Sequence, residues 1–349
     1  MPLNIWTGMH WCSPLNQNNS NMARELLQAT GRWGAVMVMG SSPGGSDTAF
    51  TYACDRVMDA RQALGGGRTL DQCVARLYYG EDRRPNSTDI PNVAGADTWL
   101  RNNGYYNSLN YFVSNGGRMC VVFNELTEPN EHQRDIDPRI MGYLGYALQN
   151  AYWNGGGENR LLYTLFPGPS GLQGFSGFQS YFDTYDLRDA NHNPQTFGQK
   201  FPGQVDPTIA NRTMLHHGGS GVFDRVALHC YANSPTEFGS ANVGGNQALQ
   251  YIQWLLTTVD SSGWVYVTES GGALVLDDYD NGVNLANFEQ NVSDLNAVTI
   301  PNGGFGGQVQ AVHGYILDIS NAGASRNNVD RFSCRAVSGY NYRRAQLGF

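Results

Sequence analysis

Short apolar runs recur along the whole chain. They are rich in β-branched and aromatic residues and are bounded by glycine or polar residues, a pattern typical of buried β-strands. The eight runs span residues 3–11, 35–42, 73–80, 119–125, 160–166, 225–232, 265–270 and 309–317. The sequence therefore predicts eight strands.

Segments with the periodicity of amphipathic helices separate these runs. Within 136–152, Pro138 fits a first helical position. Apolar side chains then repeat every four residues, at Ile140, Leu144 and Leu148. The same spacing predicts two further helices, within 248–259 and 284–298. Glycine-rich segments precede most of the strands, as expected where a helix ends and a loop leads into a strand.

Strands that alternate with helices pair in parallel through right-handed crossovers. A (β/α)8 barrel consists of eight units of one strand followed by one helix. The predicted fold class is therefore α/β, a TIM barrel. A doubly wound open sheet is the rival fold, but no GxGxxG turn follows the first strand. Because no linker rich in proline or serine interrupts the chain, we expect residues 1–349 to form a single domain.

The chain has 349 residues and a formal net charge of −8. This acidic balance disfavours nucleic acid and anionic membrane surfaces as partners, since both attract basic patches. No run of about 18 apolar residues is present, so we expect no membrane span. The first residues contain neither a basic leader nor a long apolar stretch, which predicts no signal peptide. The protein then stays inside the cell, or the sequence is an already trimmed mature form.

The cysteine and lysine residues narrow the possible chemistry. Six cysteines occur without CxxC spacing, and His10 stands alone on the first strand, so we predict no metal site and no disulfide framework. The only lysine, Lys200, lies in "FGQKFPG", a loop pattern. A P-loop needs a lysine directly after a glycine-rich run, and a Schiff-base aldolase needs a lysine nucleophile on a strand. We therefore expect neither nucleotide hydrolysis by a P-loop nor aldolase activity, and we predict no cofactor. The many aromatic and asparagine residues favour a neutral, hydroxyl-rich ligand.

In such a barrel the functional site lies at the carboxyl ends of the strands. Polar and aromatic residues gather at the predicted ends: His10, Trp11, Arg76, Asn124, Glu125, His229, Tyr231, Glu269 and Tyr315. Glu125 ends the fourth strand and Glu269 ends the seventh, on opposite sides of the ring. By strand alternation we expect Glu269 to share a face with Val265 and Val267. Two carboxylates that converge on one pocket, one protonated and one ionised, are what cleavage of a glycosidic bond requires.

Three short motifs make the chain resemble the retaining glycoside hydrolases of clan A. They are the Asn124-Glu125 pair that ends the fourth strand, "HCY" on the sixth strand and "ESG" on the seventh. The resemblance implies that Glu125 is the acid/base, that Glu269 is the nucleophile and that Asn124 binds the sugar 2-hydroxyl. It also implies that His229 lies near the acid/base and Tyr231 near the nucleophile. The implied function is hydrolysis of β-glycosidic bonds in an oligo- or polysaccharide by double displacement, with retention of configuration.

Two departures from the clan pattern keep alternatives open. The fourth-strand motif of the clan continues directly as Asn-Glu-Pro, whereas here Leu126, Thr127 and Glu128 precede the proline. Glu128 is therefore a rival for the acid role. The eighth strand of the clan often ends in tryptophan, and here Tyr315 is the nearest aromatic residue.

The remaining candidates each have a structural alternative. Arg76 either anchors neighbouring strands or holds Glu269 ionised, since a nearby cation favours a charged carboxylate. His10 is either a loop histidine or a sugar contact, and Trp11 is either a sugar platform or a core residue. The rival function is a barrel that binds carbohydrate without cleaving it, and the presence of both carboxylates argues against this rival. The sequence indicates neither the sugar and its linkage, nor exo or endo action, nor the oligomeric state.

Overall fold

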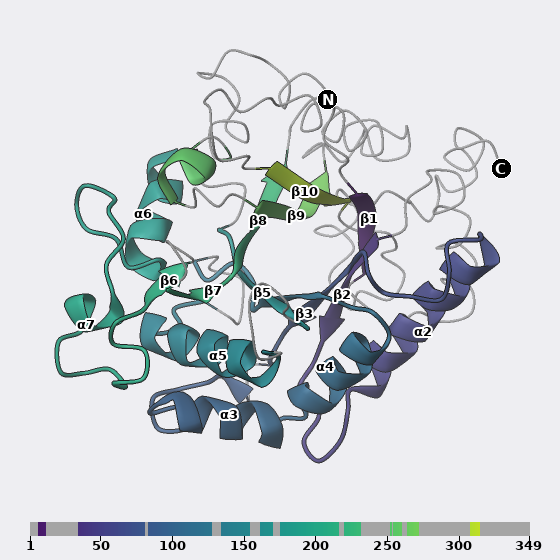
Figure 1. The fold of residues 1–349 in the computed structure, drawn as a ribbon, viewed down its shortest axis with the longest axis horizontal. Coiled ribbons are helices and arrows are strands. Elements are labelled where there is room, and N and C mark those ends of the chain that lie inside the picture. The colour runs from purple at the N-terminus through teal and green to yellow at the C-terminus, as the bar shows by residue number, and fades with distance from the viewer. Residues whose placement is uncertain are drawn as a thin grey trace, which may run out of the picture.

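The computed structural model describes residues 6–11, 34–80, 83–127, 134–153, 161–169, 175–215, 220–231, 252, 254–259, 264–271 and 308–314. Within these residues the chain forms a closed barrel of parallel strands in the order β1-β10-β9-β8-β5-β4-β3-β2 (Figure 1). The strands are β1 (Trp6–Trp11), β2 (Gly34–Met39), β3 (Cys73–Leu77), β4 (Met119–Val122), β5 (Tyr163–Phe166), β8 (Arg225–Tyr231), β9 (Trp264–Gly271) and β10 (Gln308–Gly314). Each lies within or overlaps one of the eight apolar runs, which confirms the predicted barrel and rules out the open sheet. The prediction that residues 1–349 form a single domain remains a prediction.

The helices lie outside the ring of strands (Figure 1). They are α2 (Thr48–Ala63), α3 (Val93–Asn102), α4 (Tyr105–Ser114), α5 (Pro138–Ala151), α6 (Phe175–Tyr185), α7 (Phe197–Lys200) and the π-helix η2 (Leu255–Val259). Two short parallel strands, β6 (Thr213–Leu215) and β7 (Gly221–Phe223), are inserted between β5 and β8. Lys200, which the sequence placed in a loop, is the last residue of α7. None of the described helices is both long and apolar enough to cross a membrane.

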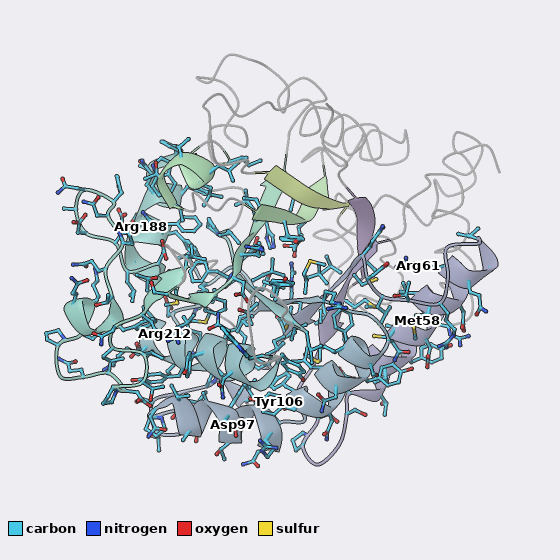
Figure 2. The ribbon with its side chains drawn as sticks, viewed as in Figure 1. Met58, Arg61, Asp97, Tyr106, Arg188 and Arg212 are labelled. Carbon is cyan, nitrogen blue, oxygen red and sulfur yellow. The ribbon has the colours of Figure 1, made fainter. Side chains whose placement is uncertain are left out.

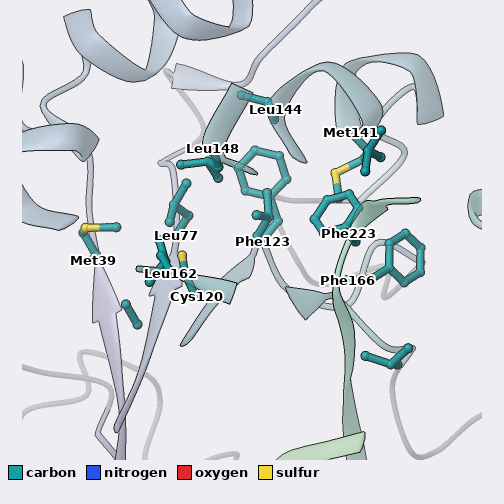
Figure 3. Close-up of a cluster of buried hydrophobic side chains, with 14 of the residues drawn as sticks. Met39, Leu77, Cys120, Phe123, Met141, Leu144, Leu148, Leu162, Phe166 and Phe223 are labelled. Carbon is teal, nitrogen blue, oxygen red and sulfur yellow. The ribbon is translucent and has the colours of Figure 1, made fainter. Parts of the chain in front are cut away.

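Helix α5 confirms the predicted helix within 136–152. Pro138 is its first residue, and the side chain of the N-cap residue Asp137 accepts a hydrogen bond from the Arg139 N–H. The stripe of residues four apart is buried against the outward face of the barrel, where Leu144 and Leu148 lie in one apolar cluster (Figure 3). Pro138 fixes its φ at a helical value and Asp137 caps the N-terminus, so a helix is favoured here. Burial of the apolar stripe then orients the helix against the barrel.

The other predicted helices have mixed outcomes. Residues 284–298 lie outside the described part of the chain. Within 248–259, the predicted apolar positions Ile252, Leu256 and Val259 are buried, but residues 255–259 adopt π-helical hydrogen bonding. The carbonyl oxygens of Thr258 and Val259 accept hydrogen bonds from the buried guanidinium of Arg188 (Figure 2). These bonds satisfy carbonyl groups at the end of the helix.

The barrel has two apolar layers. The inner layer fills the barrel with residues from alternate strand positions: Val36, Val74, Met119, Val121, Leu165, Ala227 and Tyr266. The outer layer joins the other face of the strands to the helices and includes Cys120, Val122, Leu228, Val265 and Val267. Alternation along a strand sends successive side chains to opposite faces, so a residue two positions after an inner-layer residue continues into the barrel mouth.

Strand β9 breaks this alternation. Leu228 pairs with Val267 and His229 pairs with Glu269, so β9 carries one more residue than β8 at this point. The register of β9 against β10 shifts at the same place. The prediction that Glu269 shares the face of Val265 and Val267 is therefore wrong, because those valines lie in the outer layer. The extra residue is a β-bulge, which turns Glu269 toward the inner face.

Candidate active site

Four side chains from four strands or strand ends meet at the carboxyl end of the barrel: Arg76 of β3, Glu125 just beyond β4, His229 of β8 and Glu269 of β9. Regular alternation explains two of them. Arg76 follows the inner-layer residue Val74 by two positions, and His229 follows the inner-layer residue Ala227 by two positions. The structure thus brings together four of the residues that the sequence marked at strand ends.

Arg76 is the central cation of the site. Its Nη1 donates to Glu269 Oε1, and its Nη2 donates to Thr268 Oγ1 at 3.3 Å. The side chains of Arg76 and Glu269 are only 3% and 6% exposed, so this ion pair is shielded from water. A buried cation beside a carboxylate favours its ionised form. Of the two interpretations of Arg76, the geometry matches the one in which it pairs with Glu269.

His229 links the two carboxylates. Its Nε2 lies 3.1 Å from Arg76 Nη2, and its Nδ1 lies 2.6 Å from Glu125 Oε1. A guanidinium has no acceptor, so the Nε2 atom of His229 accepts and the ring proton sits on Nδ1. His229 therefore donates its Nδ1–H to Glu125. The pair is asymmetric: Glu269 receives its hydrogen bond from a cation, and Glu125 receives one from a neutral imidazole.

Glu125 lies outside a regular strand. The run 119–125 was predicted to be a strand up to Glu125, but β4 ends at Val122. The chain then turns, with φ values of 72° at Phe123 and 29° at Glu125. Positive φ values are costly for residues other than glycine and occur where the surrounding structure enforces them. This turn carries Glu125 to the pocket.

Packing and hydrogen bonds on both sides hold this turn in place. The Phe123 ring makes edge-on contacts with Tyr79 at 4.8 Å and with Trp99 at 6.5 Å between ring centroids. The carbonyl oxygen of Leu126 accepts from the Asp135 N–H at 2.9 Å and from the Tyr185 hydroxyl at 3.3 Å. These contacts hold the backbone of Phe123 and Glu125 at its positive φ values.

Asn124 presents an unused acceptor beside the carboxylates. The residue is 7% exposed, and among the described residues its Oδ1 atom has no hydrogen-bond partner. A buried polar atom without a partner costs free energy, and a bound ligand that donates to it would remove this cost.

The same side chains could instead bind a metal ion, which is the alternative to an acid and a nucleophile. Glu125, His229 and Glu269 each offer one donor atom, and these three atoms lie within 4.8 Å of one another. The guanidinium of Arg76, however, already contacts Glu269 and His229. A divalent cation at the same position would be repelled by this charge. The donor set therefore fits acid–base chemistry better than metal binding.

Three residues in or near the site were missed by the sequence reasoning. Thr268 accepts a hydrogen bond from Arg76. The sequence did not indicate this contact, because the bulge in β9 leaves no signature in the pattern of apolar residues. Tyr181 and Tyr185 of α6 flank the turn at Glu125. Burial, aided by the charges of Tyr185 and Glu125, raises the pKa of Tyr181. No prediction was made from the sequence for the segment that forms α6, so neither tyrosine was a candidate.

Several predicted site residues lie partly or wholly outside the described part of the structure. The backbone of Tyr231 belongs to β8 and pairs with Gly271, and the backbones of His10 and Trp11 belong to β1, but their side chains are outside the described part of the structure. Tyr315 and Glu128 also lie outside the described residues. The roles predicted for these residues stay predictions.

Comparison of the sequence with protein families and with curated proteins gives no match. Comparison with solved structures finds barrels of the same fold. A glucosidase from Croceicoccus marinus aligns with a TM-score of 0.54 at 10% identity over 99% of this chain and 67% of its own. A monomeric β-xylosidase from Caulobacter crescentus CB15 aligns with a TM-score of 0.51 at 11% identity, covering 99% of this chain and 68% of its own.

A third similar structure is CJP38, a β-1,3-glucanase and allergen of Cryptomeria japonica pollen. It aligns with a TM-score of 0.52 at 10% identity, over 95% of each chain. All three names describe enzymes that cleave glycosidic bonds. The fold of this chain is therefore a (β/α)8 barrel of the kind that glycoside hydrolases use, in line with the resemblance that the sequence motifs carry.

Proposed function

We propose that this protein is a retaining β-glycoside hydrolase that cleaves an oligo- or polysaccharide, with Glu269 as nucleophile and Glu125 as acid/base. The observation that carries the proposal is the asymmetric pair of carboxylates. One oxygen of Glu125 and one of Glu269 lie within 4.8 Å of each other. Arg76 donates a hydrogen bond to Glu269, whereas His229 donates one to Glu125. Retaining enzymes place their two carboxyl groups about 5–5.5 Å apart, whereas inverting enzymes leave about 6.5–9.5 Å for a water molecule.

In the first step the ionised carboxylate of Glu269 attacks the anomeric carbon. Arg76 donates to its Oε1, and we assign the attack to Oε2. Glu125 gives a proton to the leaving oxygen. Because His229 donates to Glu125 Oε1, the acidic proton belongs on Oε2, and the products are a covalent glycosyl-enzyme and the released alcohol.

In the second step Glu125, now ionised, takes a proton from water. The water oxygen attacks the anomeric carbon and the bond to Glu269 breaks, which restores both carboxyl groups and the starting configuration. The neutral His229 stays a donor to Glu125 through both steps. The Oδ1 atom of Asn124, which has no hydrogen-bond partner among the described residues, would accept a hydrogen bond from the sugar 2-hydroxyl.

A neutral carbohydrate suits the aromatic, asparagine-rich composition, and the similar structures named as a glucosidase, a xylosidase and a glucanase make β-glucosides and β-xylosides the first substrates to test. Turnover of aryl β-glucosides and β-xylosides should be measured, and the product anomer should be followed by NMR. Release of the β-anomer first supports the proposal. An α-anomer as first product contradicts retention, and binding without turnover on every substrate supports the rival, a non-catalytic sugar-binding barrel.

A further inference from the structure

A hollow lies next to the segment that carries Glu125. Its volume is about 330 Å³, at the lower end of the range for small-ligand pockets. It is lined by the segment after β3 and by the last turn of α3, including Arg84, Asn86, Asp89, Thr98, Trp99 and Asn102. Nothing in the proposed catalytic steps uses this hollow.

Contacts at its edge relate the hollow to the proposed active site. Arg84 Nη2 donates to the carbonyl oxygens of Arg134 and Asp135, at 2.7 and 3.0 Å. The N–H of Asp135 in turn bonds the carbonyl of Leu126, the residue after Glu125. Trp99, on the floor of the hollow, touches the ring of Phe123 edge-on. Lining residues of the hollow are thus linked by direct contacts to the segment that carries Glu125.

The lining has the composition of a carbohydrate subsite. Its rim is exposed and carries amide, hydroxyl, guanidinium and carboxylate groups, which together offer both donors and acceptors. The floor is buried and contains Trp99, whose indole stacks on Tyr105 at 5.3 Å and is thereby fixed in orientation. Sugar rings present hydroxyl groups around their edge and apolar C–H groups on their faces, so a polar rim with an aromatic floor matches them.

The lining carries charges of both signs, from the guanidinium groups of Arg83 and Arg84 and the carboxylate of Asp89. Arg84 Nη2 already bonds two carbonyl oxygens, and the carboxylate of Asp89 would repel an anion. We therefore propose that the hollow binds a neutral sugar unit of the substrate chain, beyond the units on either side of the cleaved bond. This inference rests on the proposed function, because it assigns the hollow to the same saccharide.

Two residues of α3 allow a clean test. Thr98 and Asn102 are four residues apart, exposed, and both line the hollow. Asp97 and Arg101 are also four residues apart on α3 and form an exposed ion pair at 3.1 Å, but they do not line the hollow. The double variant Thr98→Ala/Asn102→Ala is therefore matched by the double variant Asp97→Ala/Arg101→Ala.

Binding should be measured by calorimetry in the full chain carrying Glu269→Gln, which prevents turnover. The probes are laminaribiose and laminarihexaose, and cellobiose and cellohexaose. With two hydrogen bonds lost, we expect the lining variant to bind the preferred hexasaccharide about tenfold more weakly and the disaccharide equally well. The control variant should bind both saccharides as the parent does.

Equal binding of the hexasaccharide by the lining variant and the parent would overturn the subsite, and so would failure of the parent to bind any of the four probes. Citrate that competes with the hexasaccharide only in the parent would show an anion site and would also overturn it. Turnover of aryl glycosides by the wild-type chain separates the two proposals. If the wild type cleaves aryl glycosides and hexasaccharide binding is unaffected by the lining variant, only the subsite is wrong; if no aryl glycoside is cleaved, the proposed hydrolysis is wrong.

Discussion

Glu269 and Glu125 reach the same pocket from two different kinds of backbone. Glu269 lies within β9, where a bulge turns it inward against Arg76, and its side chain is 6% exposed. Glu125 lies in a strained turn beyond β4, hydrogen-bonded to neutral His229, with 12% of its side chain exposed. The two glutamates thus have different environments: Glu269 lies against a buried cation, and Glu125 lies against a neutral hydrogen-bond donor near the surface. Such a difference separates the roles of two carboxyl groups in one site.

The largest expected effect is the loss of the nucleophile. Glu269→Ala should lower kcat on every glycoside by roughly 10⁴-fold or more, since loss of a covalent nucleophile removes the main route through the transition state. Kinetics on natural and on activated substrates checks this. Glu128→Ala, as a control, should retain activity on both. If Glu269→Ala keeps activity on dinitrophenyl glycosides and Glu125→Ala does not, the two roles are reversed.

The second effect tests the acid. Glu125→Ala should reduce kcat/KM on substrates with a poor leaving group by about 10²–10⁴-fold, the usual contribution of general acid catalysis. Dinitrophenyl glycosides, whose leaving group needs no proton, should keep a fast first step and show a burst of dinitrophenol. If Glu128→Ala shows this pattern instead, Glu128 is the acid.

The pH dependence gives an independent check on the same residue. The first step needs a proton on Glu125, so kcat/KM should fall as the pH rises. Glutamine cannot titrate, so in Glu125→Gln this alkaline limb should be absent from the activity that remains on an activated substrate. A limb that persists unchanged in Glu125→Gln means that a different group donates the proton.

The third effect concerns the buried ion pair. Arg76→Met should lower the free energy of unfolding by about 3–5 kcal/mol, because it removes the cation that lies against the buried carboxylate of Glu269. The double variant Arg76→Met/Glu269→Gln also removes the charge of that carboxylate and should recover much of the loss. Urea denaturation of the two variants and the wild type measures the difference. Equal destabilisation in both variants would mean that packing of Arg76, rather than its charge, matters.

The smallest effect tests the hydrogen bond from Arg76 to Thr268, the extra residue of the β9 bulge. Thr268→Val keeps the shape of the side chain but removes the acceptor for Arg76 Nη2, worth about 0.5–1.5 kcal/mol. We expect kcat to fall by a few-fold, with KM unchanged, because Arg76 is then held less firmly against Glu269. Thr257→Val, an exposed threonine outside the barrel strands, is the matched control. A change in KM alone would indicate that Thr268 contacts substrate instead.

Most of the barrel was accessible from the sequence, because burial leaves a direct trace in the pattern of apolar residues. The eight runs marked the eight strands, and the stripe after Pro138 marked α5. The carboxyl ends of those strands were enough to select Arg76, Glu125, His229 and Glu269 as candidates. These predictions depend on local periodicity and on the rule that barrel sites lie at one end of the strands, and neither needs coordinates.

The tertiary structure alone decided how those four residues meet. The bulge at Thr268 inverts the face expected for Glu269, and no residue of β9 signals it, because a bulge is set by pairing with β8 and β10. The end of β4 at Val122 is set in the same way by its neighbours and by the packing of Phe123. The contact between Arg76 and His229, which places the imidazole proton on Nδ1, joins residues 153 positions apart. The sequence by itself determined which side chains stand at the barrel mouth, whereas their directions and protons depend on contacts between strands that are distant in the chain.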